Sequence, residues 1–214
     1  MNVTVSGVYF PVTALGPGTR IGIWFQGCSI HCPGCMAQDT WDPAGGTSLS
    51  HDELTDRLRS FPTGEVTGIT ISGGEPFDQP EALLQLVEWL RGSYCRADQD
   101  VLLYSGYPTA TLHSEYGAVL ACADALISEP LDEDASSSEP LRWRGSSNQI
   151  LTPLSALGRD RYALEIGAPS QGEIQIIAGD GCFWMIGVPR PGDLTRLTDS
   201  LHDSGINLKG VSWQ

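Results

Sequence analysis

Three cysteines stand close together near the start of the chain, where Cys28, Cys32 and Cys35 form a C-x3-C-x2-C pattern. Clustered thiolates are soft ligands that suit zinc or an iron–sulfur cluster. A closed zinc site or four-iron cluster normally has four protein ligands, and this segment offers three thiolates. A four-iron cluster held in this way keeps one iron open for a small molecule. The alternative is a zinc site completed by His31 or by a distant residue.

A second candidate site follows the strand-like segment 68–71, in the turn Gly73-Gly74-Glu75-Pro76. Two glycines at the end of a strand are often only a turn, and the Glu75 side chain is equally compatible with a position facing solvent. The cysteine segment also follows a strand-like run, residues 21–25. The two segments together are more specific than either motif alone.

Together, these segments resemble the radical S-adenosylmethionine (radical SAM) superfamily, in which three cysteines hold a [4Fe-4S] cluster and the open iron binds SAM. The resemblance implies that the cluster ligands are Cys28, Cys32 and Cys35. It also implies that Gly73, Gly74 and Glu75 bind the methionyl end of SAM, with the glycines allowing a close approach of the backbone. A side chain at Gly74 is therefore expected to hinder SAM while sparing the cluster.

Further segments narrow the resemblance to the activating enzymes of anaerobic ribonucleotide reductases. They are Gly16-Pro17-Gly18-Thr19-Arg20, Gln26-Gly27-Cys28, Tyr104-Ser105-Gly106-Tyr107 and the run from Arg144 to Gln149. Such enzymes bind one cluster and SAM, and they make a 5′-deoxyadenosyl radical that removes hydrogen from a backbone glycine of the reductase. The resemblance thus implies a radical SAM oxidoreductase with a protein or peptide substrate and a flavodoxin- or ferredoxin-like electron donor.

Two other functions stay open. The chain departs from the family pattern at Leu15, where aspartate is usual, and at Met36 and Ala37, which replace an aromatic residue and an asparagine. One alternative is therefore radical SAM modification of a peptide or a small metabolite. The other is a non-catalytic iron–sulfur or zinc protein, against which the Gly-Gly-Glu turn argues.

Two single residues are lesser candidates for SAM binding. Ser105 follows a strand-like segment, 101–104, and functional groups gather at the carboxyl ends of strands in βα barrels. Its alternative role is that of a plain turn residue. Asn148 suits a hydrogen bond to the ribose or carboxylate of SAM, or equally to buried backbone.

Strand-like runs alternate with helical periodicity along the chain, which predicts an α/β fold built from parallel βα units. Strands are expected at 21–25, 66–72, 101–104 and 125–127, and a helix at 83–90. The resemblance implies a partial (truncated) βα barrel of radical SAM type in residues 1–159, with the cluster loop at 27–36. Residues 160–214 are expected to form a small C-terminal α+β appendage, with two strands between 172 and 187 and a helix ending before Gly205.

The composition argues against nucleic acid and membranes as partners. With 12 basic and 26 acidic residues the formal charge is −14, which disfavours nucleic acid as a partner. We expect no membrane association, because no apolar run is long enough to span a bilayer. The N-terminus lacks the features of a secretory signal, so a cytoplasmic location is expected. The remaining cysteines, Cys95, Cys122 and Cys182, are expected to be buried small hydrophobic residues rather than disulfide partners.

Overall fold

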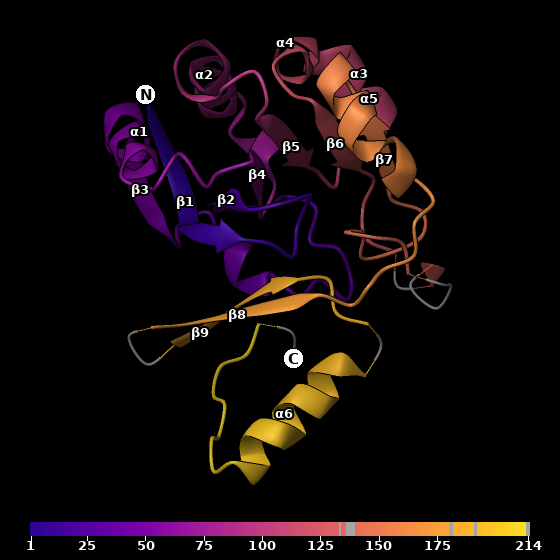
Figure 1. Ribbon diagram of the computed structural model, residues 1–214. Helices are drawn as coiled ribbons and strands as arrows, with labels where there is room; N and C mark the ends of the chain where they lie inside the picture. Colours follow the sequence, from indigo (N-terminus) through magenta and orange to yellow (C-terminus); the bar gives the residue numbers. More distant parts are fainter. Residues whose placement is uncertain (133, 136–139, 180–181, 191, 213–214) are drawn as a thin grey trace.

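A computed structural model describes residues 1–132, 134–135, 140–179, 182–190 and 192–212 (Figure 1). In these residues seven strands form one sheet in the order β3-β1-β2-β4-β5-β6-β7, and β8 and β9 form a separate hairpin. The strands are β1 (Asn2–Val12), β2 (Arg20–Phe25), β3 (Thr47–Ser50), β4 (Gly68–Gly73), β5 (Asp100–Tyr104), β6 (Ala125–Ser128), β7 (Ile150–Pro153), β8 (Ile174–Gly179) and β9 (Cys182–Gly187).

The centre of the large sheet is parallel. Strand β2 pairs with β4, β4 with β5, and β5 with β6, all in parallel. This confirms the predicted α/β class and the parallel βα units. Strands β1, β3 and β7, which were not predicted, pair antiparallel with their neighbours. The sheet is therefore mixed.

Helices α1 to α4 pack on one face of this sheet (Figure 1). Ile21 and Ile23 of β2 and Ile69 and Ile71 of β4 are completely buried against them. Successive side chains of a strand point to opposite faces, so Trp24 lies on the other side. The helices are α1 (His51–Arg59), α2 (Pro80–Trp89), α3 (Thr109–Glu115), α4 (Gly117–Ala121), α5 (Ala156–Tyr162) and α6 (Asp193–Asp203). Within the described residues, no helix combines the length and apolar character needed to cross a membrane.

A buried ion pair closes the end of the sheet at which the parallel strands begin. Arg20, the first residue of β2, is completely buried and donates hydrogen bonds of 3.0 and 2.7 Å to the carboxylate of Asp100, the first residue of β5. The same carboxylate accepts hydrogen bonds from Arg161 and Tyr162 of α5. Helix α5 therefore crosses residue 159, where the expected core ends and the expected appendage begins, and its last residues stay packed against the sheet.

The hairpin β8-β9 lies on the other side of the sheet from α1 to α4, and α6 lies beyond the hairpin (Figure 1). Ile186 of β9 is buried together with Val12, Ala14 and Leu15. No residue of α6 is fully buried. The two strands and the helix expected in the last part of the chain are therefore confirmed.

The three scattered cysteines differ in their surroundings. Cys95 and Cys122 are partly buried and pack against the main core, as expected of small hydrophobic residues. The expectation that Cys182 is buried is wrong, because its side chain is exposed. Cys182 is the first residue of β9 and lies at the outer end of a two-stranded hairpin, where little packs against it.

Candidate cofactor site

The three candidate cluster ligands lie in a loop that leaves the carboxyl end of β2. The amide of Gly27 fixes the start of this loop by donating a 2.8 Å hydrogen bond to the carbonyl oxygen of Thr40. Gly27 has a φ of +94°, a conformation that favours glycine. Further along, the Cys35 amide donates to the Cys32 carbonyl oxygen at 3.2 Å. These turns hold Cys28 and the other two cysteines in one compact loop.

All three thiols are free and partly buried. Burial raises the pKa of Cys28 and of Cys32, although backbone hydrogen bonds oppose the effect. Among the residues that the structure describes, no three His, Cys, Asp or Glu side chains converge on a point that one metal ion can occupy. In a four-iron cluster the thiolates bind different irons and need not converge in this way. Three free thiols from one loop therefore fit such a cluster.

The Gly-Gly-Glu turn lies directly against the start of the cysteine loop. The Gly74 amide donates to the Phe25 carbonyl oxygen at 2.9 Å, and the Glu75 amide donates to the Gly27 carbonyl oxygen at 2.8 Å. A Cβ atom on Gly74 would lie 2.1 Å from the Gly27 oxygen, and Gly73 has a φ of +116°. Both positions thus require glycine because of this backbone contact and conformation, whatever else binds there.

The Glu75 carboxylate is buried and joins the ends of β4 and β5. It accepts hydrogen bonds from the Phe77 amide at 3.0 Å, the Ser105 hydroxyl at 2.9 Å and the Gly106 amide at 2.8 Å. Burial raises the pKa of Glu75 to about 7, against the lowering effect of these hydrogen bonds. The structure therefore brings the predicted residues Glu75 and Ser105 together and excludes a solvent-facing Glu75.

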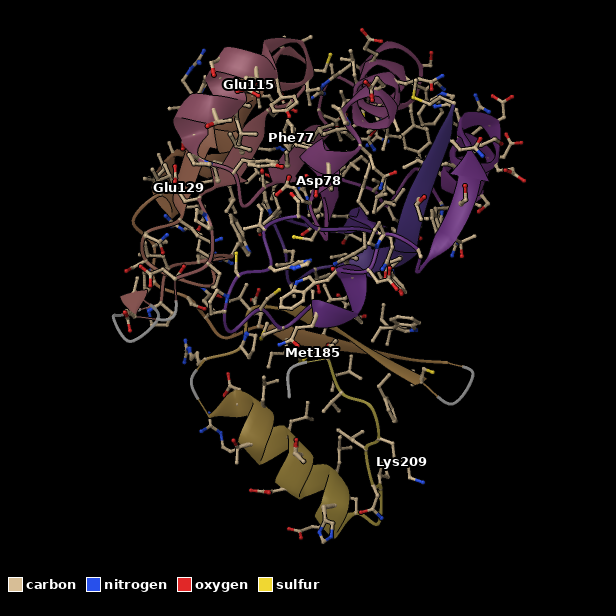
Figure 2. The ribbon with its side chains drawn as sticks, turned by 180° about the vertical axis from the view of Figure 1, so that it is seen from behind. Phe77, Asp78, Glu115, Glu129, Met185 and Lys209 are labelled. Carbon is tan, nitrogen blue, oxygen red and sulfur yellow. The ribbon has the colours of Figure 1, made fainter. Side chains whose placement is uncertain are left out.

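Asp78, which no sequence pattern singled out, ties the cysteine loop to the segment after β5 (Figure 2). Its carboxylate accepts hydrogen bonds from the amide and hydroxyl of Ser29, at 2.7 and 3.0 Å, and from the hydroxyl of Tyr107 at 2.7 Å. Ser29 directly follows the first cysteine. Asp78 escaped detection because its partners become its neighbours only when the chain folds.

Asn148 lies in the segment between β6 and β7. Its Nδ2 donates a 2.8 Å hydrogen bond to the Pro130 carbonyl oxygen. Its Oδ1 is buried and has no hydrogen-bond partner in the described part of the chain. An unused buried acceptor is costly unless a ligand or water supplies a donor. Asn148 therefore satisfies backbone with one atom and leaves the other as an unused buried acceptor.

A cavity of about 1070 Å³ opens beside the cysteine loop. Cys35 and Met36 of the loop, Gly73 of the turn, and Trp24 and Tyr104 of the sheet lie in its wall. Further walls come from β1, from the segment between β6 and β7, from the hairpin β8-β9, from α6 and from the segment 206–212. Sites for single small molecules usually measure about 300–1,000 Å³. This cavity is therefore large enough for a small-molecule ligand.

Known proteins are similar to this chain in sequence. A family model described as a 4Fe-4S single cluster domain matches residues 14–152. The anaerobic ribonucleoside-triphosphate reductase-activating protein of Vibrio cholerae is 33% identical over 150 residues, which are 67% of this chain and 94% of that protein. Its counterpart in Escherichia coli K12 is 31% identical over 149 residues, with the same coverage. The pyruvate formate-lyase-activating enzyme of Clostridium pasteurianum is 35% identical over 105 residues, or 47% of this chain and 44% of that enzyme.

The matched domain includes both the cysteine loop and the Gly-Gly-Glu turn. The relatives that cover two thirds of the chain are matched over nearly their whole length. The similarity therefore includes the complete candidate site rather than an isolated motif. This chain belongs to the radical SAM family, among the activating proteins of glycyl-radical enzymes.

Proposed function

We propose that the protein is a radical SAM oxidoreductase that generates a glycyl radical on a ribonucleotide reductase-like partner. The observation that carries the proposal is the pair of hydrogen bonds from Gly74 and Glu75 to the residues before Cys28. They set the candidate SAM-binding turn beside the candidate cluster loop. The proposed cluster ligands are Cys28, Cys32 and Cys35, and the proposed SAM contacts are Gly73, Gly74, Glu75, Ser105 and Asn148.

A cluster held by Cys28, Cys32 and Cys35 would supply the single electron that cleaves SAM to methionine and a 5′-deoxyadenosyl radical, which would take a hydrogen atom from a glycine of the partner. The chain's own groups bind and orient the reactants. Glu75 suits the SAM ammonium, because a cation favours the charged form of a carboxylate whose pKa burial has raised. Ser105 is oriented by Glu75, and the free Oδ1 of Asn148 suits a ribose hydroxyl.

Two points of architecture belong to this proposal. We take residues 1–159 as a truncated βα barrel of radical SAM type, supported by the parallel strands β2, β4, β5 and β6 with helices on one face. We take residues 160–214 as an appendage, supported by the separate hairpin β8-β9, with the end of helix α5 at residues 160–162 still packed on the sheet. A flavodoxin- or ferredoxin-like protein is the proposed reductant, because the chemistry needs electrons one at a time.

Anaerobic reconstitution tests the proposal. The protein should take up about four irons per chain, and it should release 5′-deoxyadenosine when SAM and dithionite are added. The variants Cys28→Ala, Cys32→Ala and Cys35→Ala should each lose the cluster. The matched variants Cys95→Ala, Cys122→Ala and Cys182→Ala should keep it. Stoichiometric zinc without iron in the reconstituted protein would contradict the proposal.

A further inference from the structure

The hairpin and α6 lie outside the matched cluster domain, which ends before them. The Vibrio cholerae protein is matched over 94% of its length but covers only 67% of this chain. The matched cluster domain ends at residue 152, before β8 begins at Ile174. Whatever the hairpin does is therefore additional to the chemistry that the matched domain performs.

The hairpin is held firmly beside the cavity. Gln175 of β8 accepts a hydrogen bond from the Thr13 amide at 3.1 Å and donates one to the Pro11 carbonyl oxygen at 2.5 Å. The rings of Trp184 and Tyr9 lie 5.5 Å apart. These contacts attach the hairpin to the end of β1, so its position relative to the sheet is defined.

Residues from both faces of strand β9 line the cavity. All six residues of β9, Cys182 to Gly187, line the cavity, whereas β8 contributes only Ile176. Because successive side chains of a strand point to opposite faces, a cavity above one face would be lined by alternate residues. A cavity that every residue lines therefore reaches both faces of β9, on either side of its edge away from β8.

That edge of β9 is free. Among the described residues, β8 is the one strand that pairs with β9, and it occupies the opposite edge. An unpaired edge presents backbone donors and acceptors that an extended peptide can match. The surrounding side chains are apolar, with Phe183 and Ile176 nearly half exposed. Figure 2 shows Met185 of the same strand between the sheet and α6.

The free edge and the cysteine loop share one cavity. Cys35 and Met36 line the same cavity as β9, and the segment 206–212 lines it as well. The Ser212 hydroxyl donates a 2.6 Å hydrogen bond to the Met36 carbonyl oxygen, which ties the C-terminal segment to the loop. A peptide lying along β9 therefore lies within the space that leads to the candidate cluster.

We propose that an extended segment of the protein partner, the one that carries the target glycine, pairs with the free edge of β9 and so enters the cavity. This inference rests on the proposed function, which requires a backbone glycine to reach the radical. Strand pairing suits that task because it recognises backbone groups, which glycine supplies as well as any residue, and leaves neighbouring apolar side chains to contact Phe183 and Ile176.

The test uses peptides, so that the protein stays unchanged. The probe is a peptide of about ten residues that carries the target glycine of an anaerobic ribonucleotide reductase, a length comparable to ordinary strands. Two versions carry N-methyl groups at alternate residues, one at the odd-numbered positions of the peptide and the other at the even-numbered positions. In a paired strand only alternate amides face the neighbouring strand. One version should therefore bind the reconstituted protein about 10- to 100-fold more weakly, and the other should bind like the parent peptide.

A protein variant provides a second measurement. Phe183→Ser should raise the dissociation constant of the parent peptide about tenfold or more, because an apolar contact is lost. Leu164→Ser, at an apolar residue that is 91% exposed and does not line the cavity, should leave the constant at its wild-type value. Equal changes in both variants would contradict the assigned contact.

Two results would overturn the strand-pairing proposal. One is that the two methylated peptides bind with equal affinity, either both like the parent peptide or both more weakly than it. The other is no binding of the parent peptide by protein that still converts SAM to 5′-deoxyadenosine with dithionite. Failure of SAM cleavage itself would instead overturn the proposed function, so the two proposals fail in distinguishable ways.

Discussion

The amide of Glu75 donates a 2.8 Å hydrogen bond to the carbonyl oxygen of Gly27, the residue before the first cysteine. Together with the 2.9 Å bond from Gly74 to Phe25, it makes the Gly-Gly-Glu turn part of the base of the cysteine loop. A substitution that moves the backbone of the turn must therefore also move the backbone of the loop. The two motifs behave as one unit, and the first prediction tests this.

Gly74→Ala should disturb the cluster as well as SAM binding. The added Cβ would lie 2.1 Å from the Gly27 oxygen, so the loop must shift. The structure thus replaces the expectation that a side chain at Gly74 spares the cluster. Crowding of this kind typically costs about 1–3 kcal/mol of stability. Iron content after reconstitution measures the effect, and Gly64→Ala, where a Cβ meets nothing within 4 Å, is the control. Full cluster content in Gly74→Ala would show that the loop adapts.

Asp78→Ala should loosen the cysteine loop without unfolding the protein. It removes the acceptor of the Ser29 and Tyr107 hydrogen bonds, which are exposed, so the expected loss of stability is about 0.5–1.5 kcal/mol. The reconstituted cluster should be lost to an iron chelator several-fold faster, as followed by its visible absorption. Asp160→Ala, which alters an exposed carboxylate of α5, should show the wild-type rate. An unchanged rate in Asp78→Ala would remove this residue from the site.

Glu75 should make the cluster-free protein less stable as the pH rises from about 4.5 to about 7. Burial raises its pKa to about 7 in the folded state, whereas an unfolded glutamate titrates near 4.3. Between these values the unfolded chain has lost the proton that the folded chain keeps. The free energy of unfolding therefore falls by up to about 1.4 kcal/mol per pH unit from this group.

Urea unfolding at several pH values checks this dependence. The free energy of unfolding should fall with pH more steeply in wild type than in Glu75→Gln, because the amide does not titrate. Glu81→Gln, at an exposed residue in the first turn of α2, should keep the wild-type slope. Identical slopes in wild type and Glu75→Gln would mean that Glu75 titrates normally in the folded protein.

Asp100→Asn should be strongly destabilising. The Asp100 carboxylate is the partner of the completely buried Arg20, and its loss leaves a buried guanidinium without a counter-charge. Breaking such a pair typically costs about 3–5 kcal/mol. Asp98→Asn, whose side chain is 72% exposed, should change stability by no more than about 0.5 kcal/mol. Denaturant unfolding compares the two, and similar effects would contradict the assigned role of the buried pair.

Local patterns explain how much of the fold was predictable. The parallel strands and their helices follow from apolar residues repeated at short spacing, which a sequence displays directly. Strand β1 carries a signal of the same kind in the alternation of Val3 and Val5. Strands β3 and β7 are four residues long, and pairing with distant segments defines them as strands.

The sequence by itself determined the kinds of ligand at the site and the family, because the spacing of Cys28, Cys32 and Cys35 and the Gly-Gly-Glu turn are local features. Only the tertiary structure decided that Glu75 is buried against Ser105 and that Asp78 holds the cysteine loop. It alone also placed β9 in the wall of the cavity beside that loop. The reason is physical: these relationships join residues that are far apart in the chain and meet only when the strands pack.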